Sequence, residues 1–473
     1  MKLMLFAPEL LMLLGSLLIF LFSLTDDDGK NAKNASIAVA VGTAILLFTG
    51  LNNSGDLFYN AYRVDLFSQL FKLMISLGLT AVLIFGRELK DIDDDVHPEY
   101  YLFLLLSTVG LMMLVSSIEL IAIFIALELS SFCLYVLVPM RSDQKDLRSQ
   151  MEAGIKYILF GVTATGMMLY GMSYLFGLTG TTYLVEMLPQ ITLLISQPAA
   201  IAGIAMFMCG FLFKLAVFPF HFWVPDVYQG ASNETTAFIA SVPKLGAVAI
   251  LIRIVMMAAP DGTALVDMMV VLAICSMFYG NLSALVQKDI KRMLGFSGIA
   301  HAGFVLLGLM TFKELGYATS MYYIFGYLVM NLACFLVICK VSKSGENVTV
   351  EDLTGLHKRS PVLAFTMAVG MLALAGIPPF VGFMGKFMLL AGALKAGQLT
   401  LVILAALNTA IAIFYYLSVV KAAYCDNPDG HADLDVDFAT KALSVVLVVA
   451  IIVMGVMPTQ VLAIATSAVQ SIM

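Results

Sequence analysis

Four ionisable residues lie inside long apolar segments of this 473-residue sequence: Glu128, Lys214, Lys244 and Lys386. Placing a charge at mid-bilayer costs about 2.5–3.5 kcal/mol, so each of them indicates a function. Burial favours neutral lysine and a nearby carboxylate favours the cation, so a Lys whose Glu partner approaches or withdraws can load and release a proton. Static ion pairs that only hold helices together are the alternative.

Prolines lie close to the three lysines, at positions 219, 225, 243, 378 and 379. A proline frees a backbone carbonyl, which is tolerated at membrane depth only beside protein or water. Broken helices next to ionisable residues are typical of ion pathways in transporters. The sequence therefore predicts helix breaks that serve the charged positions.

Two histidines are relay candidates. His301 lies in Gly-Ile-Ala-His-Ala-Gly-Phe, between the lysine-bearing segments, and a simple hydrogen bond to a neighbouring helix is its alternative role. His221 lies in Pro-Phe-His-Phe-Trp-Val-Pro-Asp beside the only tryptophan, where an interfacial aromatic anchor is the alternative. Lys72 is closer to a segment end, so we expect it to snorkel or to pair there.

The elements that must position these residues are membrane helices. Apolar residues make up 61% of the chain and charged residues 12%, against roughly 25% charged in soluble domains. The apolar residues run in blocks of about 20, enough to cross the bilayer as helix. We predict an all-α polytopic membrane protein with about fourteen spans: 3–24, 36–51, 66–86, 100–117, 119–139, 152–176, 199–222, 235–258, 264–282, 294–311, 316–340, 361–394, 399–421 and 442–465. The segment 177–198 is expected to be a loop with an interfacial piece.

Lysine and arginine predict the orientation. If the loop after the first span is cytoplasmic, 16 of the 26 Lys and Arg residues fall in the loops on that side and four on the other. The split obeys the positive-inside rule and supports an even number of spans. Both chain ends should then face the periplasm.

Several function classes are excluded. The formal charge of −6 offers no basic footprint for nucleic acid. The six cysteines show no C-x-x-C spacing, so neither zinc nor a cysteine-ligated iron–sulfur cluster is indicated. Dinucleotide-binding and Walker A motifs are missing as well. Energy must come from an ion gradient or from a partner.

Three stretches closely resemble the proton-conducting membrane subunits of respiratory complex I and their antiporter relatives: 211–230, 287–304 and 376–387. With Glu128, the resemblance covers nearly the whole chain. Of the three antiporter-like types, L, M and N, Val-Tyr-Gln-Gly at 227–230 and a lysine at 386 resemble the N type.

The resemblance implies two inverted five-helix repeats, spans 4–8 and 9–13, each with a broken helix, the seventh and the twelfth. It divides the chain into 1–99, 100–258, 259–421 and 422–473. It also implies proton transfer by Glu128, Lys214, Lys244 and Lys386 in a bacterial inner membrane, coupled to NADH–quinone oxidoreduction. No cofactor is expected in this chain; FMN, iron–sulfur clusters and quinone are expected in partner subunits, and the neighbouring antiporter-like subunits are the expected contacts.

The sequence departs from the family pattern after Gly230. Residues 231–236 read Ala-Ser-Asn-Glu-Thr-Thr, where the family usually has Ala-Pro-x-Pro-Val-Thr. Losing two prolines predicts a looser loop, and Glu234 predicts altered proton entry at the mouth of the eighth span. Three rival functions remain: a cation/proton antiporter or membrane-bound hydrogenase subunit, a scaffold with an inactive channel, and a solute symporter.

Overall fold

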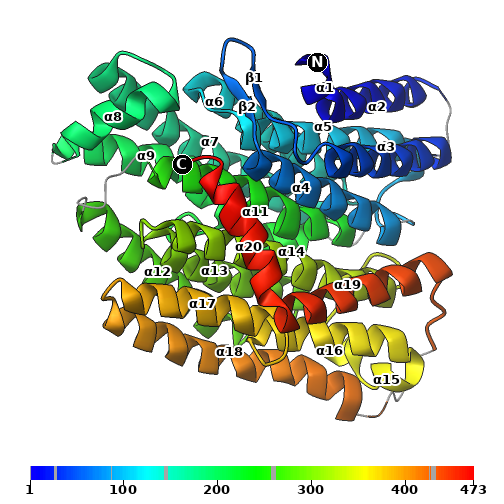
Figure 1. The fold of residues 1–473 in the computed structure, drawn as a ribbon. Helices are drawn as coiled ribbons and strands as arrows, with labels where there is room; N and C mark the ends of the chain where they lie inside the picture. The colour runs from blue at the N-terminus through cyan, green and yellow to red at the C-terminus, as the bar shows by residue number, and fades with distance from the viewer. Residues whose placement is uncertain are drawn as a thin grey trace.

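The protein is a bundle of helices packed side by side (Figure 1). The structure, a computed structural model, describes residues 2–25, 29–86, 88–142, 147–195, 197–256, 263–425, 427 and 433–473. Within these ranges, twelve helices have the length and apolar composition to cross a membrane. The other two predicted spans are the 17-residue α2 and the divided twelfth span. The chain is thus an all-α polytopic membrane protein, which confirms the expected fold class.

The N-terminal segment is helical apart from one hairpin, in which β1 and β2 pair antiparallel with Gly55 opposite Val64. Asp65 then begins α4 with a reciprocal cap, because its side chain accepts from the Ser68 backbone and the Ser68 hydroxyl receives the Asp65 N–H. The elements are α1 (Lys2–Leu5), α2 (Ala7–Ser23), α3 (Lys30–Thr49), β1 (Gly55–Leu57), β2 (Tyr62–Val64) and α4 (Leu66–Phe85).

The middle of the chain supplies the next two groups of helices. Ser117 is extended and only three residues separate α5 from α6, so the chain turns tightly between them. The first group is α5 (His97–Ser116), α6 (Leu120–Leu137), α7 (Leu147–Thr179), α8 (Leu184–Leu194), α9 (Pro198–Leu215), α10 (Val224–Gly230) and α11 (Asn233–Val255). The second is α12 (Thr263–Ala284), α13 (Ile290–Leu309), α14 (Glu314–Val341), α15 (Leu356–Arg359), α16 (Pro361–Ala375), α17 (Val381–Lys395) and α18 (Leu399–Cys425).

The core is built on α11, α13 and α14, which are buried on nearly every face. Such helices are apolar all round because no side of them meets water. The peripheral helices α7, α12, α18 and α19 (Phe438–Val456) leave apolar side chains exposed, as a lipid-facing surface requires. Three short 3-10 turns, at 94–96, 138–140 and 351–353, complete the connections.

Two helices are broken as the prolines predict. The seventh span ends at Leu215, where Ala216 adopts a left-handed φ of 69°, and resumes as α10. The twelfth ends at Ala375, followed by Gly376 with φ 85°, and resumes as α17. Glycine adopts this conformation readily, whereas alanine does so at a cost. Pro243, in contrast, does not interrupt α11.

The predicted fourteenth span was wrong as a single helix. It divides into α19 (Phe438–Val456) and α20 (Pro458–Gln470), because Pro458 cannot donate the hydrogen bond that would continue α19. In Figure 1, α20 crosses the bundle obliquely, and it packs against α14 and α4. The segment 177–198, expected to be mainly loop, contains the helix α8.

The loops gather at two ends. At one end, which we call the cation-rich face (88–96, 138–142, 229–232, 286–289 and 342–355), Arg141 donates to the Gly345 carbonyl at 2.8 Å and Lys90 to the Ser342 carbonyl at 3.0 Å. At the opposite face, two isolated antiparallel β-bridges join the backbone of Tyr62 in the hairpin to Ser117 and the backbone of Glu119 to Tyr183. The loops predicted to be cytoplasmic therefore share one end, although Arg87 and Lys145 lie outside the described residues.

Candidate functional site: a buried row of ionisable groups

Lys214 lies in the last turn of α9, immediately before the helix break. A cation is favoured there because the final carbonyls of a helix carry partial negative charge. Its ammonium donates to the Tyr157 hydroxyl at 3.5 Å and lies 5.5 Å and 5.8 Å from the rings of Tyr157 and Tyr135. Aromatic faces within about 6 Å attract a cation, so α6 and α7 together line the site.

Glu128 lies on α6 and accepts a hydrogen bond from the Thr165 hydroxyl of α7 at 2.8 Å. The negative charge of Glu128 interacts electrostatically with the ammonium of Lys214. Within the described ranges, however, the two side chains form no ion pair at 4 Å or less. The structure therefore places the predicted pair near each other without an ion pair between them.

Lys244 lies at the centre of the molecule, in the middle of α11, and is 1% exposed. Its ammonium donates to the Tyr327 hydroxyl of α14 at 3.1 Å and lies 4.9 Å from that ring. Lys244, Gly298, His301, Tyr323 and Tyr327 line a narrow internal gap between α11, α13 and α14 that has no room for a water molecule. Lys244 and His301 thus face a common internal space.

His301 is hydrogen-bonded on both ring nitrogens. Nδ1 lies 2.6 Å from the Tyr323 hydroxyl and Nε2 lies 3.1 Å from the Tyr416 hydroxyl, which also bonds Ser297. A neutral imidazole donates through one nitrogen and accepts through the other, so the ring joins α14 to α18 by two different kinds of bond. The charges of Lys244 and Lys386 both act on this ring.

Lys386 lies in α17, 4% exposed, and points back across the helix break. Its ammonium donates to the carbonyls of Leu374 at 2.9 Å and Ala375 at 3.2 Å, the last two residues of α16. Terminal carbonyls have no partner within their own helix, so the break supplies the acceptors that hold the cation. The Phe304 ring of α13 lies 5.1 Å from the same nitrogen.

His221 does not join this row. Its ring packs among Phe218, Phe222 and Tyr279, with centroids 4.2–5.3 Å apart. Both ring nitrogens are buried without a hydrogen-bond partner among the described residues. The contacts favour the aromatic-packing alternative over a relay.

Several polar residues of the site escaped sequence reasoning: Tyr157, Thr165, Ser297, Tyr323, Tyr327 and Tyr416. Each supplies a hydroxyl to one of the predicted residues or to another of these hydroxyls. Buried tyrosine hydroxyls usually find partners, so tyrosines deep inside the predicted spans were the available signal. Which of them faces a lysine depends on helix packing, which the sequence does not display.

Lys72 forms an ion pair, which is one of the two outcomes expected for it. Its ammonium lies 2.8 Å from Glu9 Oε1, and both side chains are 0% exposed, so it does not snorkel. The Tyr62 hydroxyl donates to the same carboxylate oxygen at 2.7 Å and receives the Lys72 N–H at 2.9 Å. This buried cluster ties α2, α4 and the hairpin together at the opposite face.

The segment 231–236 is also better fixed than its lost prolines predict. The Ser232 side chain caps α11 by accepting from the Thr235 backbone at 3.1 Å, and Asn233 donates to the carbonyl of Glu346 at 3.4 Å. All six residues are buried. A serine cap replaces proline as the device that begins the helix.

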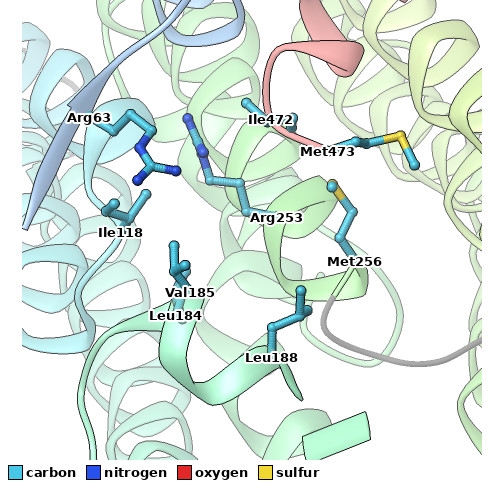
Figure 2. Close-up of a pocket in the computed structure, with 9 residues that line it drawn as sticks. All are labelled: Arg63, Ile118, Leu184, Val185, Leu188, Arg253, Met256, Ile472 and Met473. Atoms are coloured by element: carbon cyan, nitrogen blue, oxygen red, sulfur yellow. The ribbon is translucent and has the colours of Figure 1, made fainter. Parts of the chain in front are cut away.

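A pocket of about 190 Å³ opens at the opposite face, where Arg63 and Arg253 point toward one another (Figure 2). Both arginines already have carboxylate partners at 2.9 Å, Asp56 for Arg63 and Asp65 for Arg253. Apolar residues of α8 and of the chain end complete the walls. None of the four mid-span charges lines this pocket.

Fold and site together define a class: a polytopic helical membrane protein with ionisable groups set through its middle and next to its helix breaks. A family model described as NADH:quinone oxidoreductase/Mrp antiporter, TM, matches residues 117–412. NADH-quinone oxidoreductase subunit N 2 of Opitutus terrae is 52% identical, covering 96% of this chain and 95% of that protein. The protein of that name from Syntrophobacter fumaroxidans is 42% identical, covering 99% of both. The chain belongs to this family, among its subunit N members.

Solved structures agree with the fold. A chain of respiratory complex I from Thermus thermophilus, with bound aureothin, is 28% identical, with a TM-score of 0.83 and coverage of 97% of this chain and 99% of that one. An archaeal membrane-bound sulfane sulfur reductase chain is 21% identical, with a TM-score of 0.89 and coverage of 98% and 96%. A chain of the Mrp complex from Dietzia sp. is 20% identical, with a TM-score of 0.86 and coverage of 100% and 98%. The last two show the fold alone.

Proposed function

We propose that this chain is a proton-translocating membrane-arm subunit of a bacterial NADH–quinone oxidoreductase, multi-pass in the inner membrane beside other antiporter-like subunits. The observation that carries the mechanism is the row of buried groups Lys214, Lys244, His301 and Lys386, each held by hydroxyls or freed carbonyls. Such partners stabilise an ammonium without fixing it by a carboxylate. The proton can therefore leave at modest cost.

In this mechanism each residue has a distinct role. Glu128 modulates Lys214 through its charge, and a displacement of Glu128 makes Lys214 release its proton. Lys244 carries the proton centrally, and His301 relays it toward Lys386 through its two hydroxyl partners. Lys386 exchanges with the far side at the helix break. His221 is the weaker relay candidate, because its ring nitrogens have no partner among the described residues.

Redox chemistry belongs to partner subunits in this proposal. FMN, iron–sulfur clusters and quinone would be held there, and their energy would reach this chain as a conformational or electrostatic change. The purified subunit alone should neither oxidise NADH nor carry a chromophore. An absorbing group bound one-to-one to the isolated chain would contradict this part.

The repeats are proposed on the positions of the breaks. Residues 100–258 and 259–421 would form two inverted five-helix units, broken between α9 and α10 and between α16 and α17, flanked by 1–99 and 422–473. Superposing α5–α11 on α12–α18 with the membrane normal inverted tests this. A failure of the two breaks to coincide would contradict it.

The function is tested on the intact complex reconstituted in sealed vesicles. Lys244→Met should abolish most NADH-driven proton transport through this subunit, whereas Lys313→Met, a loop lysine at the opposite face, should not. Wild-type pumping in the Lys244 variant would favour the scaffold with an inactive channel. Co-purification with cation-exchange activity but without redox subunits would favour the antiporter, whose fold the Mrp chain shares.

A further inference from the structure

Glu234 is a buried carboxylate without a fixed partner. It lies in the first turn of α11, 7% exposed, against Gly86 at the end of α4, where an added Cβ would come 2.6 Å from its Cγ. Among the described residues it forms no ion pair within 4 Å. A carboxylate in this setting is costly to keep charged, and no ion pair among the described residues assigns it a structural role.

A second carboxylate, Asp91, lies close enough for the two charges to repel each other. Asp91 does have a committed partner, because its Oδ2 lies 3.0 Å from Nε of Arg141. Burial raises the pKa of Asp91 even though Arg141 and Lys291 oppose the shift. When two carboxylates share a site, their repulsion favours protonation of one of them, and a nearby arginine favours the charged form of the one that it contacts.

The remaining groups around Glu234 come from every packed element. Lys291 of α13 is fully buried and donates to the Ala231 carbonyl at 2.8 Å. Lys90 donates to the Ser342 carbonyl at 3.0 Å. Their ammonium groups are therefore engaged elsewhere but still act on Glu234. The other neighbours that interact with its charge are Tyr100 and Tyr101 of α5 and Cys339 of α14.

Polar side chains lie between Ser241 of α11 and Lys244. Ser241 follows Glu234 by two helical turns and so lies on the same face of α11. Its hydroxyl accepts from Asn331 Nδ2 of α14 at 3.0 Å. Asn331 lies one turn from Tyr327, whose hydroxyl binds the Lys244 ammonium at 3.1 Å. Glu234 and Lys244 are about 15 Å apart along α11, and Ser241 lies about 10 Å along that length from Glu234.

We propose that Glu234 is the proton-loading residue at the cation-rich face, and that it supplies Lys244 by way of Ser241, Asn331 and Tyr327. Protonated Glu234 releases its proton along this path, with water filling the gaps, and neutral Lys244 accepts it to become an ammonium. The resulting carboxylate is reprotonated from the aqueous phase. This inference rests on the proposed function, since it assumes that Lys244 carries protons.

The test uses the intact complex in sealed vesicles, with proton transport and NADH oxidation measured across pH. Glu234→Gln should slow transport by about tenfold, most strongly at alkaline pH where protons are scarce, because positioned proton donors are worth at least that much. Glu234→Asp should restore much of the rate with a shifted pH profile. Asp95→Asn removes an exposed carboxylate in the loop before α5 and is the matched control.

The outcomes separate the two proposals. Wild-type transport at every pH in Glu234→Gln, with transport lost in Lys244→Met, overturns the loading role alone. Wild-type transport in both variants overturns the proposed function itself. If the complex with Glu234→Gln does not assemble, proton transport across pH is measured in Glu234→Ala instead, and wild-type transport at every pH again overturns the loading role. A uniform loss across pH that Glu234→Asp does not rescue identifies a structural residue and contradicts the proposal.

Discussion

The ammonium of Lys386 lies 2.9 Å from the carbonyl oxygen of Leu374, across the break between α16 and α17. The cation is thus held by neutral backbone dipoles, and among the described residues no carboxylate lies within ion-pair distance of it. Loss of the proton leaves an amine that can still donate to the same oxygen. The geometry permits both protonation states without rearrangement.

Lys386→Met should therefore leave assembly intact, because replacing a buried charge by an apolar side chain of similar length is often neutral for folding. Proton pumping should fall strongly, and electron transfer with it if the two are tightly coupled. Lys386→Arg should also fail, because guanidinium does not deprotonate in this pH range. Lys395→Met, an exposed lysine at the end of the same helix, is the control. Normal pumping in both Lys386 variants would refute the role of Lys386 as a proton carrier and favour a purely structural role.

Glu128→Gln should reduce pumping nearly as much, because the control of Lys214 requires a negative charge. Thr165→Val removes the hydrogen bond to Glu128 but keeps the carboxylate, so we expect a smaller effect of a few-fold, in line with about 1 kcal/mol for one hydrogen bond. Initial rates of vesicle acidification measure both. Equal effects of the two variants would show that the hydrogen bond, not the charge, matters.

Gly298→Ala tests the contact between Lys244 and Tyr327 without touching either residue. A Cβ at this position would lie 2.7 Å from Lys244 Nζ and 2.9 Å from the Tyr327 hydroxyl, so at least one of these side chains must shift. Pumping should slow while the complex still assembles. Gly166→Ala is the matched control, because a Cβ at this position in α7 meets open space, and it should leave the pumping rate unchanged. An unaffected Gly298 variant would argue against the pair.

The buried pair Glu9–Lys72 should contribute to stability. Glu9→Gln removes the anion and leaves a buried cation unpaired, which should destabilise the protein by about 3–5 kcal/mol. The double variant Glu9→Leu with Lys72→Met should recover most of that loss, since no charge then remains buried. Thermal unfolding in detergent of Glu9→Leu, Lys72→Met and the double variant measures the coupling. Strict additivity would show that the pair does not interact.

The orientation can be tested by labelling cysteines from outside intact cells, in a background with exposed Cys425 replaced by serine. A cysteine at Ser344, exposed on the cation-rich face, should stay unlabelled because that face is predicted to be cytoplasmic. A cysteine at Tyr59, 96% exposed on the hairpin of the opposite face, should react. The reverse pattern would invert the topology.

The sequence by itself determined the all-α membrane fold, the two helix breaks and the identity of the charged residues. These follow from short-range physics: apolar length, the missing N–H of proline, and the cost of placing a charge in hydrocarbon. Even there, Pro243 and Pro458 had opposite effects, because continuation of α11 depends on the helices that surround it. Local sequence does not contain that information.

The hydrogen-bond and ion-pair partners of the buried residues depend on the tertiary structure. The hydroxyls of Tyr157, Tyr323, Tyr327 and Tyr416 reach the buried row from helices far apart in sequence, and Lys72 meets Glu9 rather than water. Partners are set by the rotation and depth of packed helices, and a turn of about 100° per residue separates a lysine that faces a tyrosine from one that faces lipid. That choice depends on the packing of the whole bundle, so it could only be found in the folded chain.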